Sequence, residues 1–329
     1  MSQIFKEVLR ELERERNQSE KALNARRNFL HENMPEIKEI DDELAGVGLA
    51  LAKMVLHREE GTEKAGALRK RSELLVRNRE RLLYENGYDE AYFEDMYKCM
   101  DCKDTGFVGS LRCHCLKQRI IAKYYEKSNL SKVLERENFD SFNMNYYSDI
   151  ADSACGISPK DNMERIYTNS LKFVENFDSR FENLLLYGPT GLGKSFLSNC
   201  IAKELLDKGK IVLYTSAGNL FKMVEAERFN RNNQTANADV LSLVFDVDLL
   251  IIDDLGTEFS TSVTNSELFN FINTRLLNKK STIISTNLAP RDFEGIYSDR
   301  ITSRLFGEYT LLRFIGEDIR IAKKHGLYK

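Results

Sequence analysis

Apolar residues recur at helical spacing in the first part of the chain. Ile4, Val8 and Leu12 share one face of a helix, and charged residues fill the opposite face. Pro35 disfavours helix in the residue before it, so this region is divided into successive helices. The pattern predicts a helical hairpin or small bundle over residues 1–98, with a solvated helical spacer as the alternative.

A different pattern begins at residue 160, where short apolar runs alternate with helical segments. The runs are Leu184–Tyr187, Ile211–Tyr214, Leu249–Ile252 and Thr282–Ser285. Short apolar strands that alternate with helices are typical of a parallel sheet covered on both faces. The pattern therefore predicts an α/β domain over residues 160–329.

The segment between these regions has no single period. Residues 116–138 have a helical pattern, whereas the stretch from Phe139 to Pro159 is rich in Asn, Ser, Asp and Tyr. Such a composition is typical of a loop. We therefore predict a helix followed by a linker over residues 116–159.

The composition limits what the chain can be. Its 329 residues suit about two domains, and its 30% charged and 42% hydrophobic residues suit a folded core with solvated helical surface. The net charge of −3 excludes a global field that draws the whole protein to nucleic acid. No apolar run approaches the ~20 residues of a membrane span, and the N-terminus lacks the apolar core of a secretory signal. We expect a cytoplasmic protein without membrane contact.

Four of the six cysteines crowd into residues 99–115, in the spacing C-x₂-C and C-x-C. Four thiolates so close in sequence can close a tetrahedral zinc site, whose metal folds a segment too small to fold unaided. The second pair is tighter than usual, and His114 between its cysteines is expected to point away. Reduced thiols in a loop are the alternative, and we favour a structural clip joining the two domains over a DNA contact. The predicted zinc ligands are Cys99, Cys102, Cys113 and Cys115.

Residues 188–195 read GPTGLGKS, a full match to the phosphate-binding pattern G-x-x-x-x-G-K-[ST]. A strand pattern precedes it and a helix pattern follows it, as this loop requires. Glycines permit backbone angles that turn several N–H groups toward phosphate oxygens, and the helix N-terminus adds to the attraction. Lys194 is expected to reach the β- and γ-phosphates, and the Ser195 hydroxyl to bind Mg²⁺. The predicted nucleotide-binding residues are Gly188, Pro189, Thr190, Gly191, Leu192, Gly193, Lys194 and Ser195.

The apolar run Leu249–Ile252 ends in two acids, Asp253 and Asp254. Asp253 is expected to hold the Mg²⁺ shell, as the second acidic element of P-loop ATPases does. Asp254 is expected to polarise or orient the attacking water. Its side chain is shorter than that of glutamate, so Glu258 is kept as an alternative base.

Two further features complete the predicted catalytic set. Asn287 follows another strand pattern and can bond both the γ-phosphate and the attacking water, with a simple turn residue at the strand end as the alternative. Arg300 and Arg304 lie one helical turn apart and would share a helix face. An arginine supplied by a neighbouring subunit can neutralise charge in phosphoryl transfer, and a surface salt-bridge pair is the alternative.

The order of these motifs resembles that of the AAA+ ATPases, and within them the DnaC/DnaI family of replicative helicase loaders. The resemblance runs from about residue 139 to the end and rests on NLLLYGPTGLGKSFLSNCIAKEL, DLLIIDDLGTE, IISTNL, SDRITSRL and GEDIRIAKK. The cysteine-bearing segment of residues 99–115, here called the knuckle, resembles the zinc-bearing part of Gram-positive members. The N-terminal helices resemble those of the family only in their charged, helical character.

The resemblance implies an ATP-controlled loader that binds the hexameric replicative helicase and delivers it onto single-stranded DNA. It implies a helicase-binding surface in the N-terminal domain, self-association through the ATPase domain, and action of Arg300 or Arg304 across a subunit interface. It also implies that Arg320 is the sensor-II arginine, which contacts the nucleotide. One departure is that the common DE pair is DD here, at Asp253 and Asp254, which leaves the turnover rate open.

Two other functions stay open. IstB-type transposition helpers share most of these ATPase motifs, although the knuckle and the helical N-terminus argue against them. A nucleotide-gated adaptor with little turnover is the non-enzymatic alternative. Residues 219–231 contain basic and aromatic residues of the kind that contact single-stranded DNA: Phe221, Lys222, Arg228, Phe229 and Arg231. The same residues also fit an amphipathic helix with a solvated face, and we assign no DNA contact to them.

Overall fold

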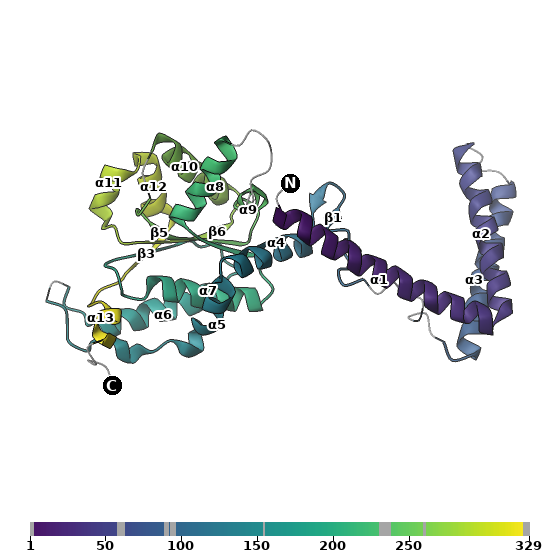
Figure 1. Cartoon of the computed structure of the whole chain (residues 1–329), viewed down its shortest axis with the longest axis horizontal. Helices are drawn as coiled ribbons and strands as arrows, with labels where there is room; N and C mark the ends of the chain where they lie inside the picture. The colour runs from purple at the N-terminus through teal and green to yellow at the C-terminus, as the bar shows by residue number, and fades with distance from the viewer. Residues whose placement is uncertain are drawn as a thin grey trace. The chain divides into compact units, whose positions relative to one another are not determined.

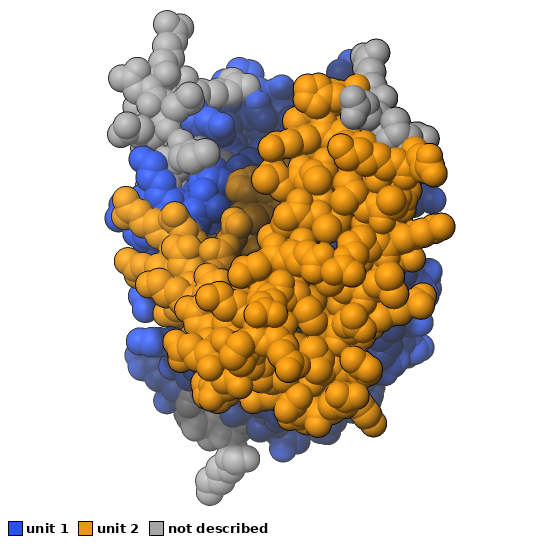
Figure 2. Space-filling view, turned by 90° about the vertical axis from the view of Figure 1, so that its right-hand side faces the viewer, with its two compact units in different colours: residues 1–9, 112–329 blue, residues 10–111 orange. Residues whose placement is uncertain are grey.

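The structure is a computed structural model that describes residues 3–57, 63–88, 92, 97–153, 155–229, 238–258 and 261–324. Its residues fall into two compact units, one of residues 10–111 and one of residues 1–9 and 112–329 (Figure 2). Each unit is defined by the contacts among its own residues.

Residues 10–111 are mainly helical, as the apolar pattern predicts. Helix α1 (Gln3–Asn33), which begins in the other unit, is followed by α2 (Pro35–Leu56) and α3 (Glu63–Glu85). Pro35 occupies the first turn of α2, where a missing N–H is tolerated. The expected break between successive helices before this proline is therefore present, and α2 and α3 pack against each other as a hairpin (Figure 1).

An apolar cluster and a half-buried carboxylate hold these helices together. Leu30, Ile37 and Leu83 are buried together, one from each helix. Asp41 accepts from His31 at 2.8 Å and from Arg79 at 2.7 Å. Its partners come from α1 and α3, so this half-buried carboxylate ties α2 to both neighbours.

A five-stranded parallel sheet forms the centre of the second unit, which confirms the predicted α/β fold. Its strand order is β4-β5-β6-β3-β7. The strands are β3 (Leu184–Tyr187), β4 (Val212–Ser216), β5 (Leu249–Leu255), β6 (Ser281–Thr286) and β7 (Thr310–Arg313). The apolar runs predicted the first four. They missed β7 because only Leu312 of that edge strand is buried.

Helices cover both faces of this sheet (Figure 1). α7 packs on one face, whereas α8 and α10 pack on the other. Within the described ranges, no helix has both the length and the apolar character needed to cross a bilayer. The helices are α6 (Pro159–Glu175), α7 (Lys194–Asp207), α8 (Ala217–Phe229), α9 (Ala238–Leu243), α10 (Ser262–Leu277), α11 (Phe293–Ile296), α12 (Asp299–Glu308) and α13 (Ile319–Lys324).

The segment expected to be a helix and a linker is ordered against the sheet domain. It forms α4 (His114–Lys127), α5 (Leu130–Arg136) and two 3₁₀ turns, η2 (Phe139–Ser141) and η3 (Met144–Tyr146). Aromatic contacts fix it, since the ring of Phe142 lies 5.0 Å from that of Tyr167 on α6 and 5.7 Å from that of Phe196 on α7. This segment belongs to the unit that contains the sheet.

The residues weighed as single-strand DNA contacts lie on and after α8. Phe221 is 3% exposed and belongs to the core, whereas Lys222 is exposed. Arg231 and the side chains of Arg228 and Phe229 lie outside the described residues.

Candidate nucleotide-binding site

The glycine loop joins the end of β3 to the start of α7, which is the context its pattern predicts. Gly188 has a φ of +138°, and a Cβ there would lie 2.3 Å from the carbonyl oxygen of Phe314, directly after β7. Gly193 has a φ of +91° and caps α7. Both positions therefore require glycine, because a side chain would be strained at one and would clash with backbone at the other.

Lys194 is almost fully enclosed by this loop. It is 5% exposed, and its ammonium donates to the carbonyl oxygens of Gly188 at 2.7 Å and Pro189 at 2.6 Å. Burial lowers the pKa of Lys194 to about 8, opposed by the carboxylates of Asp254 and Asp253. The ammonium is thus held at the centre of the loop, and it loses its proton more readily than an exposed lysine does.

Asp253 lies at the carboxyl end of β5 and is bonded by three hydroxyl groups. Ser195 donates to its Oδ1 at 3.1 Å, Tyr214 donates to its Oδ2 at 2.7 Å, and Ser285 also donates to Oδ1. A carboxylate beside a serine hydroxyl is an oxygen donor set that suits Mg²⁺. The residues predicted to hold magnesium, Ser195 and Asp253, therefore lie together.

Asp254 interrupts the pairing of β5 with β6. The register shifts between Ile252 and Leu255, and Asp254 has a φ of +56°. Its N–H donates to the Ser285 hydroxyl at 2.9 Å, in place of a regular ladder bond. Burial and the neighbouring Asp253 raise the pKa of Asp254, so this carboxyl is a better proton acceptor than an ordinary surface aspartate.

Glu258, the alternative base, is engaged elsewhere. Its carboxylate accepts from the backbone N–H of Gly256 at 2.8 Å and from the Tyr297 hydroxyl. Glu258 is not among the described residues that line the pocket at the carboxyl ends of β3, β5 and β6, whereas Asp254 is.

A pocket of about 430 Å³ opens at the carboxyl ends of β3, β5 and β6. It brings together residues that are far apart in sequence, from the glycine loop, the ends of the strands and helix α13. The predicted residues that line it are Thr190, Gly191, Gly193, Lys194, Ser195, Asp254, Asn287 and Arg320.

Arg320 lies over the glycine loop from α13. Its guanidinium donates to the Thr190 hydroxyl at 2.7 Å. Asp318 holds the start of this short helix, accepting from the N–H of Arg320 at 2.8 Å, and the N–H of Ile319 donates to the Gly191 carbonyl at 3.0 Å. Arg320 is therefore attached to the loop by its own side chain and by the backbone N–H of its neighbour Ile319.

The paired arginines of α12 lie apart from this pocket. Arg300 is exposed, and the Nε of Arg304 lies 3.4 Å from the Asn273 side-chain oxygen on α10. Among the described residues that line the pocket, none comes from α12. The two arginines are thus not brought to the site of their own chain.

Residues 111–320 match the model of the family described as IstB-like ATP binding protein. The chain belongs to this family. The match covers the whole sheet and the pocket, so ATP is the ligand that the family assigns to the site. The predicted AAA+ P-loop type of the domain is confirmed.

Replicative helicase loaders are among the proteins similar to the chain. The replicative helicase loader DnaC of Buchnera aphidicola subsp. Baizongia pistaciae is 26% identical over 164 residues, which cover 50% of this chain and 66% of the loader. DnaC of Escherichia coli strain K12 is 27% identical over 134 residues, covering 41% and 54%. The chain thus spans less than two thirds of either loader. A crystal structure of the DnaC helicase loader aligns with 56% of this chain and 99% of that chain, at 20% identity and a TM-score of 0.45. The expected resemblance to DnaC-type loaders is confirmed.

Sequence reasoning missed one wall of the pocket in this IstB-like domain. Phe142, Tyr146 and Tyr147 line it from the segment expected to be a linker. The Tyr147 hydroxyl donates to the Leu192 carbonyl at 3.1 Å, and the rings of Phe142 and Tyr147 stack at 6.1 Å. The signal was the density of aromatic residues between 139 and 147, which is unusual for a solvated linker.

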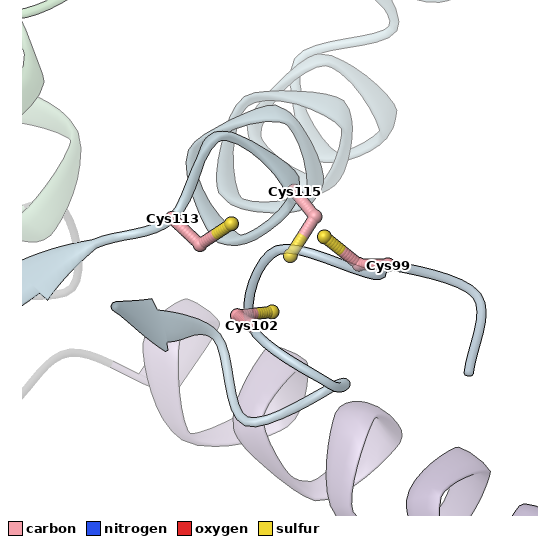
Figure 3. Close-up of side chains that lie close together, drawn as sticks. All are labelled: Cys99, Cys102, Cys113 and Cys115. Atoms are coloured by element: carbon pink, nitrogen blue, oxygen red, sulfur yellow. The ribbon is translucent and has the colours of Figure 1, made fainter. Parts of the chain in front are cut away.

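The four predicted cysteine ligands lie together before and at the start of α4 (Figure 3). Their sulfur atoms all lie within 4.8 Å of one another. Backbone groups support the arrangement: Gly106 donates its N–H to the Cys102 sulfur at 3.3 Å, and buried Asp104 accepts from the N–H of Lys98 and of Cys99, both at 2.9 Å. The donor set fits a thiolate-bound metal.

His114 does not turn away from this cluster, contrary to expectation. Its Nδ1 lies 3.5 Å from the Cys113 sulfur. A second possible set of ligands therefore exists, in which Asp101 and His114 join Cys99 and Cys113 within the same 4.8 Å limit.

The pKa of Lys194 predicts a pH-dependent ATP affinity. Before ATP binds, this lysine has a pKa of about 8, and it must be protonated to hold phosphate. Raising the pH from about 7 to about 9 should therefore weaken ATP binding by about tenfold, with proton uptake on binding at the higher pH. Calorimetry in buffers of different ionisation enthalpy measures both quantities.

Lys194→Arg is the matched variant, because arginine keeps its charge over this range. Its ATP affinity should not change between the two pH values. An equal loss of affinity in both proteins would show that another group is responsible.

Proposed function

We propose that this IstB-like protein is an ATP-dependent loader of the replicative DNA helicase onto single-stranded DNA. The observation that carries the proposal is the convergence of Lys194, Asp254, Asn287 and Arg320 on one pocket of a domain similar to DnaC loaders. Residues 10–111 form a second compact unit, which we propose as the surface for a partner. We assign the helicase to that unit and place the activity in the cytoplasm.

The residues of the pocket, together with Asp253 bonded to Ser195, suit hydrolysis of ATP. The loop N–H groups and Lys194 hold the phosphates, and Ser195 with Asp253 holds Mg²⁺, which neutralises charge on the phosphates. Asp254 accepts a hydrogen bond from the attacking water and orients it. Asn287, at the end of β6, bonds the γ-phosphate and the same water.

The paired arginines suit action between subunits. Arg300 and Arg304 lie on α12, outside the pocket of their own chain, which supports a role at the pocket of another copy. We propose that the ATPase domains self-associate and that one of these arginines completes the neighbour's site. ATP would then favour the assembled state because it binds that state more tightly.

A transposition helper of the IstB type is the second candidate, favoured by the family match itself. Such a helper would bind duplex DNA and a transposase. The family model matches from residue 111 onward, so the helical unit and the first cysteine pair lie outside it and favour the loader. A nucleotide-gated adaptor without turnover is distinguished by the ATPase measurements below.

The loader proposal is tested with the full chain and its hexameric replicative helicase. We expect ATP-dependent association of the two proteins and ATP turnover that changes when helicase and single-stranded DNA are added. Lys194→Ala, which lacks the phosphate-binding ammonium, is the control for nucleotide dependence. Absence of helicase association with ATP, ADP or no nucleotide would refute the loader, and binding of duplex DNA with a transposase would support the helper.

Asp254→Asn should lower ATP turnover by about a hundredfold or more, since it removes the general base. It should leave ATP affinity nearly unchanged, because Lys194 and the loop still hold the phosphates. Turnover and nucleotide binding are measured separately on each protein. Glu258→Gln is the matched control and should retain turnover. The reverse result, with loss only in the Glu258 variant, would exchange the roles of the two acids.

We also propose that Cys99, Cys102, Cys113 and Cys115 bind zinc. Three of them are buried and the fourth is partly buried, which suits a closed structural site rather than a catalytic one. The metal would hold the turn of residues 99–106 against the start of α4.

Metal analysis of purified protein should find about one zinc ion per chain. Cys102→Ser should lose the metal, because this thiol belongs to the four-cysteine set. Cys155→Ser should retain it, and so should His114→Ala. Loss of zinc in the His114 variant with retention in the Cys102 variant would instead assign the set that contains Asp101.

A further inference from the structure

The two oxygens of the Asp253 carboxylate have different partners. Oδ1 accepts from Ser195 on the helix after the glycine loop, at 3.1 Å, and from Ser285. Oδ2 accepts from the Tyr214 hydroxyl at 2.7 Å. Oδ1 therefore lies toward the predicted magnesium ligand Ser195, whereas Oδ2 is held from the other direction by a phenol.

Tyr214 reaches this carboxylate from the neighbouring strand. In the β4–β5 register Ser216 lies opposite Asp253, so Tyr214 is two residues earlier on the same face. This diagonal spacing is within reach of an aromatic side chain across paired strands. The ring is 8% exposed, which leaves it little freedom to turn away from Oδ2.

The strand that carries Tyr214 is an edge strand, and α4 bonds its outer edge. The Tyr125 hydroxyl donates to the Val212 carbonyl at 2.6 Å and accepts from the Tyr214 N–H at 2.9 Å. The Tyr124 hydroxyl lies 3.3 Å from that of Thr215. These phenols take the place of a further strand, so both the backbone and the side chain of Tyr214 are fixed.

We propose that Tyr214 is a positioning residue for magnesium binding, which it supports by fixing the Asp253 carboxylate through Oδ2. The proposal rests on the nucleotide site proposed above. Groups that hydrogen-bond a metal ligand fix its orientation, and their loss typically weakens metal binding by about 10- to 100-fold. Without the phenol, the carboxylate can rotate and Oδ1 is no longer held toward Ser195.

A purely structural role predicts a different result. A buried tyrosine that only fills space would lower thermal stability when changed, without altering the requirement for magnesium. The measurement that separates the two roles is therefore magnesium dependence of nucleotide binding, independent of turnover.

The experiment uses the full chain and a fluorescent, non-hydrolysable ATP analogue. Binding is titrated in EDTA and then over a range of magnesium concentrations. Tyr214→Phe removes one hydroxyl and keeps the ring. It should raise the half-saturating magnesium concentration by about tenfold and leave the affinity in EDTA unchanged.

Two further variants complete the design. Tyr309→Phe is the matched control, since Tyr309 is 6% exposed and directly precedes β7, at the opposite end of the strands from Asp253. It should keep the wild-type magnesium requirement. Tyr125→Phe leaves the Asp253 contacts in place but frees the backbone of Tyr214, so it should raise the requirement less than Tyr214→Phe does. It also tests the proposal if Tyr214→Phe does not fold.

The outcomes separate this inference from the proposed function. If the wild-type protein binds the analogue equally well with and without magnesium, both the ATPase proposal and the role of Tyr214 are overturned. Magnesium-dependent wild-type binding with an unchanged requirement in Tyr214→Phe would overturn the role of Tyr214 alone.

Discussion

The parallel pairing of β3 with β6 and of β6 with β5 is the constraint on which the site depends. Parallel strands end at the same edge of a sheet, so the glycine loop, the Asp253–Asp254 pair and Asn287 arrive together although about a hundred residues separate the first from the last. A one-residue slip of β5 against its neighbours would turn Asp253 to the other face of the sheet. Ser285 and Tyr214, which bond Asp253 from both neighbouring strands, hold the register at the place where it matters most.

The second constraint comes from β7, the strand that lies on the other side of β3. Its continuation brings the Phe314 carbonyl so close to Gly188 that no side chain fits between them. The chain then turns back over the loop, and the backbone of Ile319 bonds Gly191. Arg320 therefore reaches Thr190 because the loop and the C-terminal segment are packed without a gap.

The sequence was most informative where chemistry demands a fixed local pattern. The glycine loop, the strand ending in Asp253 and the strand before Asn287 could be predicted because buried parallel strands are continuous apolar runs. β7 could not, since a single buried residue gives no run. The aromatic wall with Tyr147 and the Tyr214 contact were also beyond reach. Both depend on contacts between segments that are distant in sequence. A tyrosine in an apolar run is expected to be an ordinary core residue, and only the structure shows that the Tyr214 hydroxyl bonds a carboxylate.

The two edges of the sheet are protected in different ways, and this difference bears on function. Edge strands expose unpaired backbone groups that invite pairing with other chains. β7 limits that hazard by being short, at 4 residues. β4 is instead bonded along its edge by Tyr125 of α4, a helix whose first turn contains Cys115 of the thiol cluster. A helix that begins at the cysteine cluster thus fixes the strand whose tyrosine bonds the Asp253 carboxylate. The cysteine cluster and Asp253 are thus joined through one helix and one strand, by the hydrogen bonds of Tyr125 to β4 and of Tyr214 to Asp253.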